Sequence, residues 1–141
     1  MLNLIFDFDG VIGDTFEEFC EAIVHIGMAP DIDSAQVLSR DYVSKKSPHT
    51  RDHTLTNDEL GKEYETYKAL GLYVSEKGFG LFDNFVSEIE QVNTENKAIV
   101  SSNIQSCILP AISNTRINPT HILAFENHHS KEEKIETICQ D

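Results

Sequence analysis

The chain has 141 residues, 40% of them hydrophobic, which is enough for one compact domain with a modest core. It carries 24 acidic residues against 11 Lys and Arg, for a net charge of −13, and such a chain repels nucleic acid and anionic membranes. No stretch has the length and apolarity of a membrane span, no secretory signal is recognisable, and the three cysteines are widely spaced. We therefore expect a cytoplasmic protein with reduced cysteines, with no nucleic-acid partner and no membrane partner.

The first predicted element is a short buried strand in the apolar run Leu2–Phe6. Asp7 and Asp9 follow it within the sequence DFDGVIGDT, and their spacing of two points them to the same side of an extended chain. Two like charges at one strand end are unfavourable unless a cation lies between them. Because open α/β sheets bind ligands at the carboxyl ends of their strands, this pair predicts a functional site.

Helical periodicity follows the first strand. Capping boxes, Thr15 with Glu18 and Thr56 with Glu59, mark two helix starts. The predicted helices span residues 15–27, 34–43 and 56–71, with a polar, basic loop over 44–56. A crossover between two strands needs far fewer residues, so we interpret 16–79 as a helical cap inserted over the strand ends and hinged near Gly13 and residues 78–80.

The second half of the chain alternates helices and short apolar runs. Helices are predicted over 81–92, 103–113 and 130–139, and strands over 97–102 and 121–125. Pro110 is expected to kink the second of these helices or to mark its start, and Ser130 with Glu133 forms a third capping box. The alternation predicts an α/β fold with a Rossmann-like parallel sheet, whose core comprises residues 1–15 and 80–141.

The two carboxylates suit phosphoryl transfer. Asp7 can act as a nucleophile that accepts a phosphoryl group, and Asp9 can protonate the leaving oxygen and later activate water. Attack of an anion on an anion is electrostatically unfavourable, and a hard cation such as Mg²⁺, bound by Asp7 and Asp9, relieves the repulsion.

The sequence DFDGVIGDT resembles the first motif of the haloacid dehalogenase (HAD) superfamily, DxDG(T/V) followed by D(T/S). The resemblance implies a HAD-like core with a small helical cap of the first type, Asp7 as the nucleophile, and Asp9 as acid/base and as a metal ligand through its main-chain carbonyl. Dehalogenase members carry a non-acid at the second position and phosphonatases carry Ala. Asp9 therefore points to phosphate esters.

The second family motif is a strand that ends in Ser or Thr, and KAIVSSN matches it. Ser101 is then expected to hold the phosphoryl group, with Ser102 as the neighbouring alternative and Asn103 orienting the substrate. The third motif is a Lys near a helix start. Lys131 fits it, because a cation in the first helical turn opposes the helix dipole and asks for a nearby anion. Lys134 is a rival that we interpret as a solvated surface residue.

The fourth family motif, a strand ending in acidic residues, has no counterpart before Asp141. The resemblance therefore implies a C-terminally truncated HAD-like core, with a Mg²⁺ site short of one ligand and impaired turnover. The first strand is then expected at a sheet edge, where it could pair with a second copy in a homodimer.

Other charged residues carry weaker expectations. Lys46 and Arg51 lie in the basic loop of the cap and are candidates for a second anionic group of the substrate, although a solvated loop is the simpler interpretation. His128 and His129 adjoin Glu126 and suggest a metal, but adjacent histidines in a loop are more often surface groups.

The sequence thus favours a HAD-like phosphohydrolase that acts on a small phosphorylated metabolite through an aspartyl-phosphate intermediate. A phosphomutase, a non-catalytic binding or assembly domain, and a fragment of a longer enzyme remain as alternatives.

Overall fold

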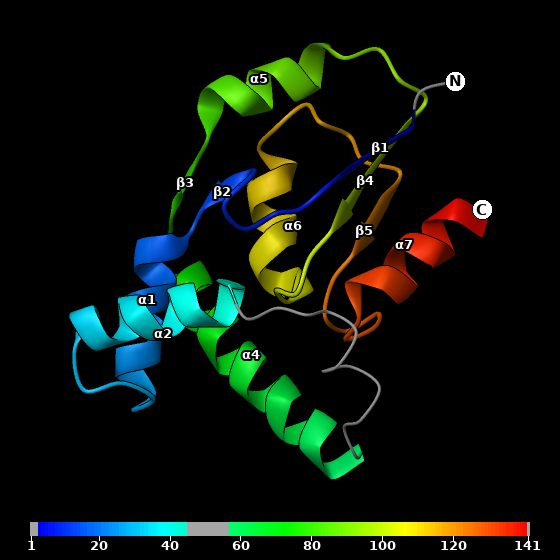
Figure 1. The fold of residues 1–141 in the computed structure, drawn as a ribbon. Coiled ribbons are helices and arrows are strands. Elements are labelled where there is room, and N and C mark those ends of the chain that lie inside the picture. Colours follow the sequence, from blue (N-terminus) through cyan, green and yellow to red (C-terminus); the bar gives the residue numbers. More distant parts are fainter. Residues whose placement is uncertain (1–2, 45–56, 141) are drawn as a thin grey trace.

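A computed structural model describes residues 3–44 and 57–140. Its centre is a parallel sheet of three strands in the order β1-β4-β5 (Figure 1). The strands are β1 (Asn3–Phe6), β4 (Asn96–Val100) and β5 (His121–Leu123). Ile5 pairs with Ala98 and Ile99 with Ile122, so all three strands point their carboxyl ends the same way. The α/β class and the parallel sheet are as predicted.

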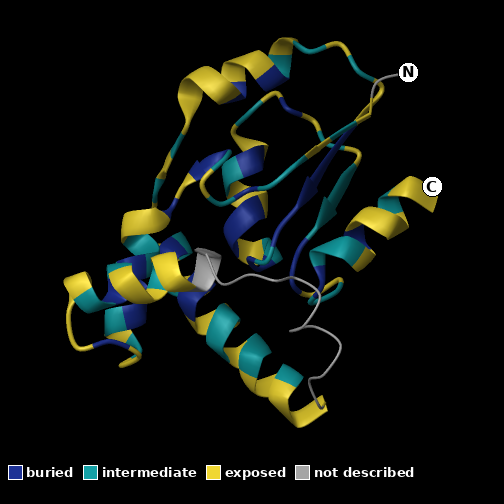
Figure 2. Ribbon diagram, viewed as in Figure 1, coloured by how far each residue is buried: buried dark blue, intermediate teal, exposed yellow. Residues whose placement is uncertain are grey.

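Helices lie on both sides of this sheet. Figure 1 shows α5 (Asp83–Gln91) and α6 (Gln105–Ser113) on one side and α7 (Lys131–Gln140) on the other. Apolar side chains of α5 and α6 pack with Phe8 and Ile99 in one buried cluster. The central strand β4 is therefore buried over most of its length (Figure 2), whereas β1 pairs only with β4 among the described residues. The prediction that the first strand forms a sheet edge is confirmed for this sheet.

A short ribbon joins the sheet to a helical unit. β2 (Gly13–Asp14) pairs antiparallel with β3 (Gly80–Leu81), so the chain leaves and returns at one place. A Cβ at Gly13 would lie 3.0 Å from the Phe8 ring and 3.3 Å from the Phe79 ring, closer than side chains normally pack. A side chain at Gly13 would therefore need these two rings to shift by a few tenths of an ångström.

The helical unit between the two ribbon strands contains α1 (Phe16–His25), α2 (Ile32–Ser44) and α4 (Asn57–Lys77). Its buried residues, such as Cys20 and Val74, share one apolar cluster with Ile104 and Phe125 of the sheet domain. The helical unit thus packs on the sheet domain instead of standing apart from it.

The described helices include none that is long and apolar enough to cross a membrane.

The structure corrects one helix prediction and narrows another. The third helix was expected to end at Gly71, but α4 continues to Lys77, and Gly71 lies inside it where the absence of a side chain lets Ile104 pack closely. Pro110 lies inside α6 and does not mark its start, and the kink that was the alternative stays a prediction. A proline there cannot donate to the Ser106 carbonyl, and the Ser75 hydroxyl of α4 donates to that carbonyl instead, at 3.4 Å.

Candidate functional site

Asp7 lies at the carboxyl end of β1 with its carboxylate facing solvent. Phe8, the next residue, is fully buried, so the backbone alternation turns Asp7 and Asp9 away from the apolar cluster. The Asp7 Oδ1 atom accepts a hydrogen bond from the Phe8 N–H at 2.8 Å. Its Oδ2 atom lies 2.5 Å from the Lys131 Nζ atom. The carboxylate is therefore oriented by its own backbone and paired with a cation.

Asp9 lies deeper and is surrounded by hydrogen-bond donors. The Thr15 hydroxyl donates to Oδ1 at 2.8 Å, and the Asn103 amide donates to the same atom at 3.1 Å. The Ser101 hydroxyl donates to Oδ2 at 3.2 Å. These contacts join the loop after β1, the start of α1 and the segment after β4, so the fold fixes the orientation of this carboxyl group.

The environment of Asp9 raises its pKa above the ordinary value of 3.8. Removal of the carboxyl group from water is the main cause, and the negative charge of Asp7 adds to it. The hydrogen bonds from Thr15, Asn103 and Ser101 act in the opposite direction but do not cancel the effect. Two carboxylates of the same type are thus placed in different environments, one solvent-facing and ion-paired, the other desolvated.

The segment after β4 was predicted to bind substrate, and its side chains contact Asp9. Ser101 is fully buried, and its hydroxyl also accepts the Asn103 N–H at 3.0 Å. Asn103 is buried too, with its Oδ1 atom accepting the Ile104 N–H at 2.8 Å. Ser102 is half-buried and is the more accessible hydroxyl of the two serines. Ser101 and Asn103 therefore belong to the site through Asp9, and their contact with substrate stays a prediction.

Lys134 was interpreted as a solvated surface residue, and this was wrong. Its side chain is 1% exposed, and its Nζ atom donates to the Ser101 carbonyl at 2.5 Å and to the Ala124 carbonyl at 3.1 Å. Lys131, one turn earlier on α7, reaches Asp7 instead. The two lysines thus have separate roles, since Lys134 joins the ends of β4 and β5 beneath the site.

The capping box predicted at Thr15 is also absent. Thr15 is the N-terminal cap residue of α1, but its side chain makes no capping hydrogen bond. Its hydroxyl donates to Asp9 instead. The capping contact at Ser130 is present, because the Glu133 N–H donates to the Ser130 hydroxyl at 3.4 Å. The cap box at Thr56 lies outside the described residues.

Helix α4 contacts the site directly. A Cβ at Gly71 would lie 2.6 Å from the Ile104 Cγ1 atom and 2.8 Å from the Asn103 Oδ1 atom, so the α4 backbone packs tightly against both. Cys107 is buried nearby, and burial together with the Asp9 charge raises the pKa of its thiol to about 12. This thiol stays protonated and unreactive. Asn103 therefore contacts both the backbone of α4 and the carboxyl group of Asp9.

The remaining candidates are Lys46, Arg51, His128 and His129. Lys46 and Arg51 fall outside the described residues. His128 and His129 are half-buried with stacked rings, and the Ser130 N–H donates to the His128 Nδ1 atom at 3.0 Å. Both Glu126 carboxylate oxygens accept the Gln105 N–H at 3.1 Å. No group of three or more His, Cys, Asp and Glu side chains suited to a metal occurs within residues 3–44 and 57–140.

Comparison with known proteins gave no match to a family model, to a curated protein or to a solved structure. The fold and the site geometry therefore define the class: an α/β protein with a parallel sheet, whose strand ends carry two carboxylates and a paired lysine.

Proposed function

We propose that the protein is a HAD-type phosphohydrolase that acts on a small phosphorylated metabolite. The observation that supports the proposal best is the pairing of Asp7 with Lys131, beside an Asp9 that is hydrogen-bonded to Ser101. These four residues come from the carboxyl ends of β1 and β4 and from the start of α7, where parallel α/β sheets bind ligands. They are also the residues that the three motifs pick out.

In the proposed reaction an Asp7 carboxylate oxygen attacks phosphorus and forms an acyl phosphate, while the bond from phosphorus to the leaving oxygen breaks. Asp9 gives its proton to the leaving oxygen. Water then attacks phosphorus, Asp9 takes a proton from that water, and the bond between Asp7 and phosphorus breaks to release inorganic phosphate. The raised pKa of Asp9 supports this role, because a general acid must hold its proton until the leaving group departs.

Lys131 supplies positive charge where the nucleophile and the phosphate meet. Its side chain is 33% exposed and that of Asp7 is 38% exposed, so a substrate can reach both. A cation held at this point stabilises the charge that develops on the phosphoryl oxygens in the transition state. The interaction with Asp7 also restricts the carboxylate to one orientation.

The donor set fits Mg²⁺ with few protein ligands. The Asp7 carboxylate oxygens have one partner each, the Phe8 N–H and the Lys131 ammonium, and keep further acceptor capacity. The Asp9 carboxyl oxygens accept hydrogen bonds from Thr15, Asn103 and Ser101, and the resemblance implies its main-chain carbonyl as the metal ligand. Mg²⁺ commonly takes one or two protein oxygens and completes its shell with water and phosphate. When bound, it offsets the negative charge that the nucleophile and the phosphate bring together.

The proposal is tested by release of phosphate from 4-nitrophenyl phosphate with and without Mg²⁺. We expect Mg²⁺-dependent turnover in the wild-type protein and its loss in Asp7→Asn. Asp83→Asn is the matched control, since Asp83 is an exposed acid at the start of α5. Equal activity in the wild type and Asp7→Asn would exclude the mechanism.

A further inference from the structure

A polar pocket lies at the edge of the sheet where the parallel strands begin. Its volume is about 420 Å³, within the range of small-molecule sites. The loop from α5 to β4 and the loop from α6 to β5 line it, and Figure 1 shows both loops at the amino ends of the strands. Asp7 follows the carboxyl end of β1, so this pocket is separate from the proposed phosphoryl site.

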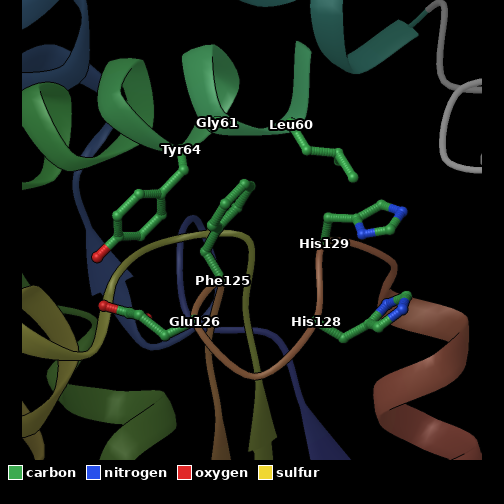
Figure 3. A pocket seen from close by; sticks show the side chains of 7 residues that line it. All are labelled: Leu60, Gly61, Tyr64, Phe125, Glu126, His128 and His129. Carbon is green, nitrogen blue, oxygen red and sulfur yellow. The ribbon is translucent and has the colours of Figure 1, made fainter. Parts of the chain in front are cut away.

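The pocket beside α4 has a different character (Figure 3). The Phe125 ring stacks on those of Tyr64 and Tyr67, and the His128 ring stacks on that of His129. The rings of that pocket thus have partners within the protein, whereas the polar pocket contains a charged group that lacks one.

This charged group belongs to Lys97, the second residue of β4, whose side chain is only 8% exposed. Lys97 lies two residues before Ile99, so both side chains point to the side of the sheet on which α5 and α6 pack. Its backbone is fixed, because the Thr120 N–H and hydroxyl donate to the Lys97 carbonyl at 2.8 and 3.1 Å. Lysine is almost never buried to this extent unless its ammonium is paired.

The Lys97 ammonium has no counter-charge among the residues that the structure describes, since its side chain makes no hydrogen bond and no ion pair with any of them. Every fully buried side-chain nitrogen or oxygen atom within residues 3–44 and 57–140 has a hydrogen-bond partner. The ammonium therefore reaches the open space of the pocket. A charge that has lost most of its water is unfavourable without an opposite charge, so an anion in this pocket would be stabilised.

Glu90 lines the same pocket but has a different partner. Its Oε1 atom accepts the Arg116 N–H at 2.8 Å, and its Oε2 atom lies 3.5 Å from the Arg116 Nη2 atom. The Glu90 carboxylate thus holds the loop from α6 to β5 in place. The Arg116 guanidinium is largely exposed and retains further donors for a second contact.

The lining favours an anion with a single charge. Two carboxylates, Glu90 and Glu95, are balanced by two cations, Lys97 and Arg116. The whole chain carries a net charge of −13, which repels a doubly charged phosphate more than a carboxylate. The other polar residues of the lining are neutral: Gln91, Asn93, Thr94, Asn118 and Thr120. These side chains suit a small ligand that carries hydrogen-bonding groups besides its charge.

From these observations we infer that the pocket binds the carboxylate group of a small polar molecule, with the Lys97 ammonium as its partner. The site does not depend on the proposed function, because it shares no residue with the phosphoryl site.

An NMR titration of the isotope-labelled protein tests the site, with sodium acetate replacing sodium chloride at constant ionic strength. We expect saturable shifts of the backbone amide signals of residues 95–97 and 116–120. Lys97→Met should weaken acetate binding at least about tenfold, the effect of losing one charged hydrogen-bond partner. Lys97→Arg keeps the charge and should retain binding. Lys68→Met is the matched control, because it removes an exposed lysine of α4.

Thermal unfolding in acetate-free buffer separates ligand binding from a structural role. Lys97→Met should unfold at the same temperature as the wild type or higher, because methionine keeps the length of the side chain and removes the unpaired charge. A lower unfolding temperature would show that the ammonium stabilises the empty protein and would overturn the proposal. Acetate shifts that survive Lys97→Met, or tighter binding of inorganic phosphate than of acetate at these amides, would also overturn it.

Discussion

The Lys131 ammonium lies 2.5 Å from the Asp7 Oδ2 atom, although 124 residues separate the two in the chain. β1 and α7 each place one partner at the same end of the sheet. Lys134 lies on the same helix and is directed to the carbonyls of Ser101 and Ala124. Two lysines three residues apart thus serve different purposes, and the difference can be measured.

Lys131→Met should reduce activity and leave the fold intact. The Lys131 side chain is 33% exposed, and ion pairs of that kind contribute about 1 kcal/mol or less to stability. Loss of a cation from a phosphoryl site lowers kcat by about 10²- to 10³-fold. Urea unfolding together with kcat separates the two effects, and full activity of this variant would remove Lys131 from the mechanism.

Lys134→Met should lower the stability of the protein in urea unfolding, unlike Lys131→Met. Methionine matches the length of the aliphatic chain but leaves the Ser101 and Ala124 carbonyls without their charged donor. Hydrogen bonds to charged groups contribute about 1.5–3 kcal/mol each, so we expect a loss of about 2–4 kcal/mol in the free energy of unfolding. A variant as stable as the wild type would show that burial of the ammonium costs as much as its hydrogen bonds return.

Asp9→Asn should stabilise the protein at neutral pH and inactivate it. Because the pKa of Asp9 is raised in the folded state, its protonated form contributes stability at pH below the ordinary 3.8, and this stability is lost as pH rises through the folded pKa. Asparagine carries no charge at any pH. The stability gained by Asp9→Asn in metal-free buffer should therefore increase with pH above 3.8 and then level off, while kcat falls by about 10²- to 10⁴-fold. A stability difference that decreases with rising pH would contradict the burial of Asp9.

Gly71→Ala should disturb the site through α4. The added methyl group would lie 2.6 Å from Ile104 and 2.8 Å from the Asn103 Oδ1 atom, so Asn103 must move away from Asp9. Overpacking costs about 1–3 kcal/mol, against about 1 kcal/mol gained in helix propensity. We expect Gly71→Ala to lower both kcat and the stability measured by thermal unfolding. Gly61→Ala is the control, because a Cβ there meets no atom within 4 Å, and it should leave the thermal stability unchanged or raise it.

Local patterns in the sequence predicted most of the secondary structure. The apolar runs at 97–102 and 121–125 and the helical periodicity at 130–139 depend on near neighbours, and the structure has strands or a helix at each of them. The spacing of Asp7 and Asp9 is also a local pattern, so the sequence could predict that both carboxylates point to the same side. Their nearness to Ser101 and Lys131 was expected only from the family motifs that these segments resemble.

The errors occurred where tertiary contacts decide. Thr15 fits a capping box by sequence, but its hydroxyl donates to Asp9 and makes no capping hydrogen bond to α1. Gly71 fits the sequence signal for a helix end, but in the structure it lies within α4 and packs against Ile104. No local sequence signal predicts that Lys134 is buried. The pocket lined by Gly61 of α4 and His128 could not be predicted either, because the two residues lie far apart in the sequence and come together only through the packing of α4 on the sheet domain.

The most direct measurement of the central claim is chemical detection of a phosphoryl group on Asp7. In Asp9→Asn, 4-nitrophenyl phosphate should still transfer its phosphoryl group, because this leaving group needs no proton, while hydrolysis of the intermediate lacks its base. Acid quench, proteolysis and mass spectrometry should then place a phosphoryl group on Asp7, and Asp7→Asn should show none. Turnover in the wild type with no phosphoryl group on Asp7, or one on another residue, would contradict the account.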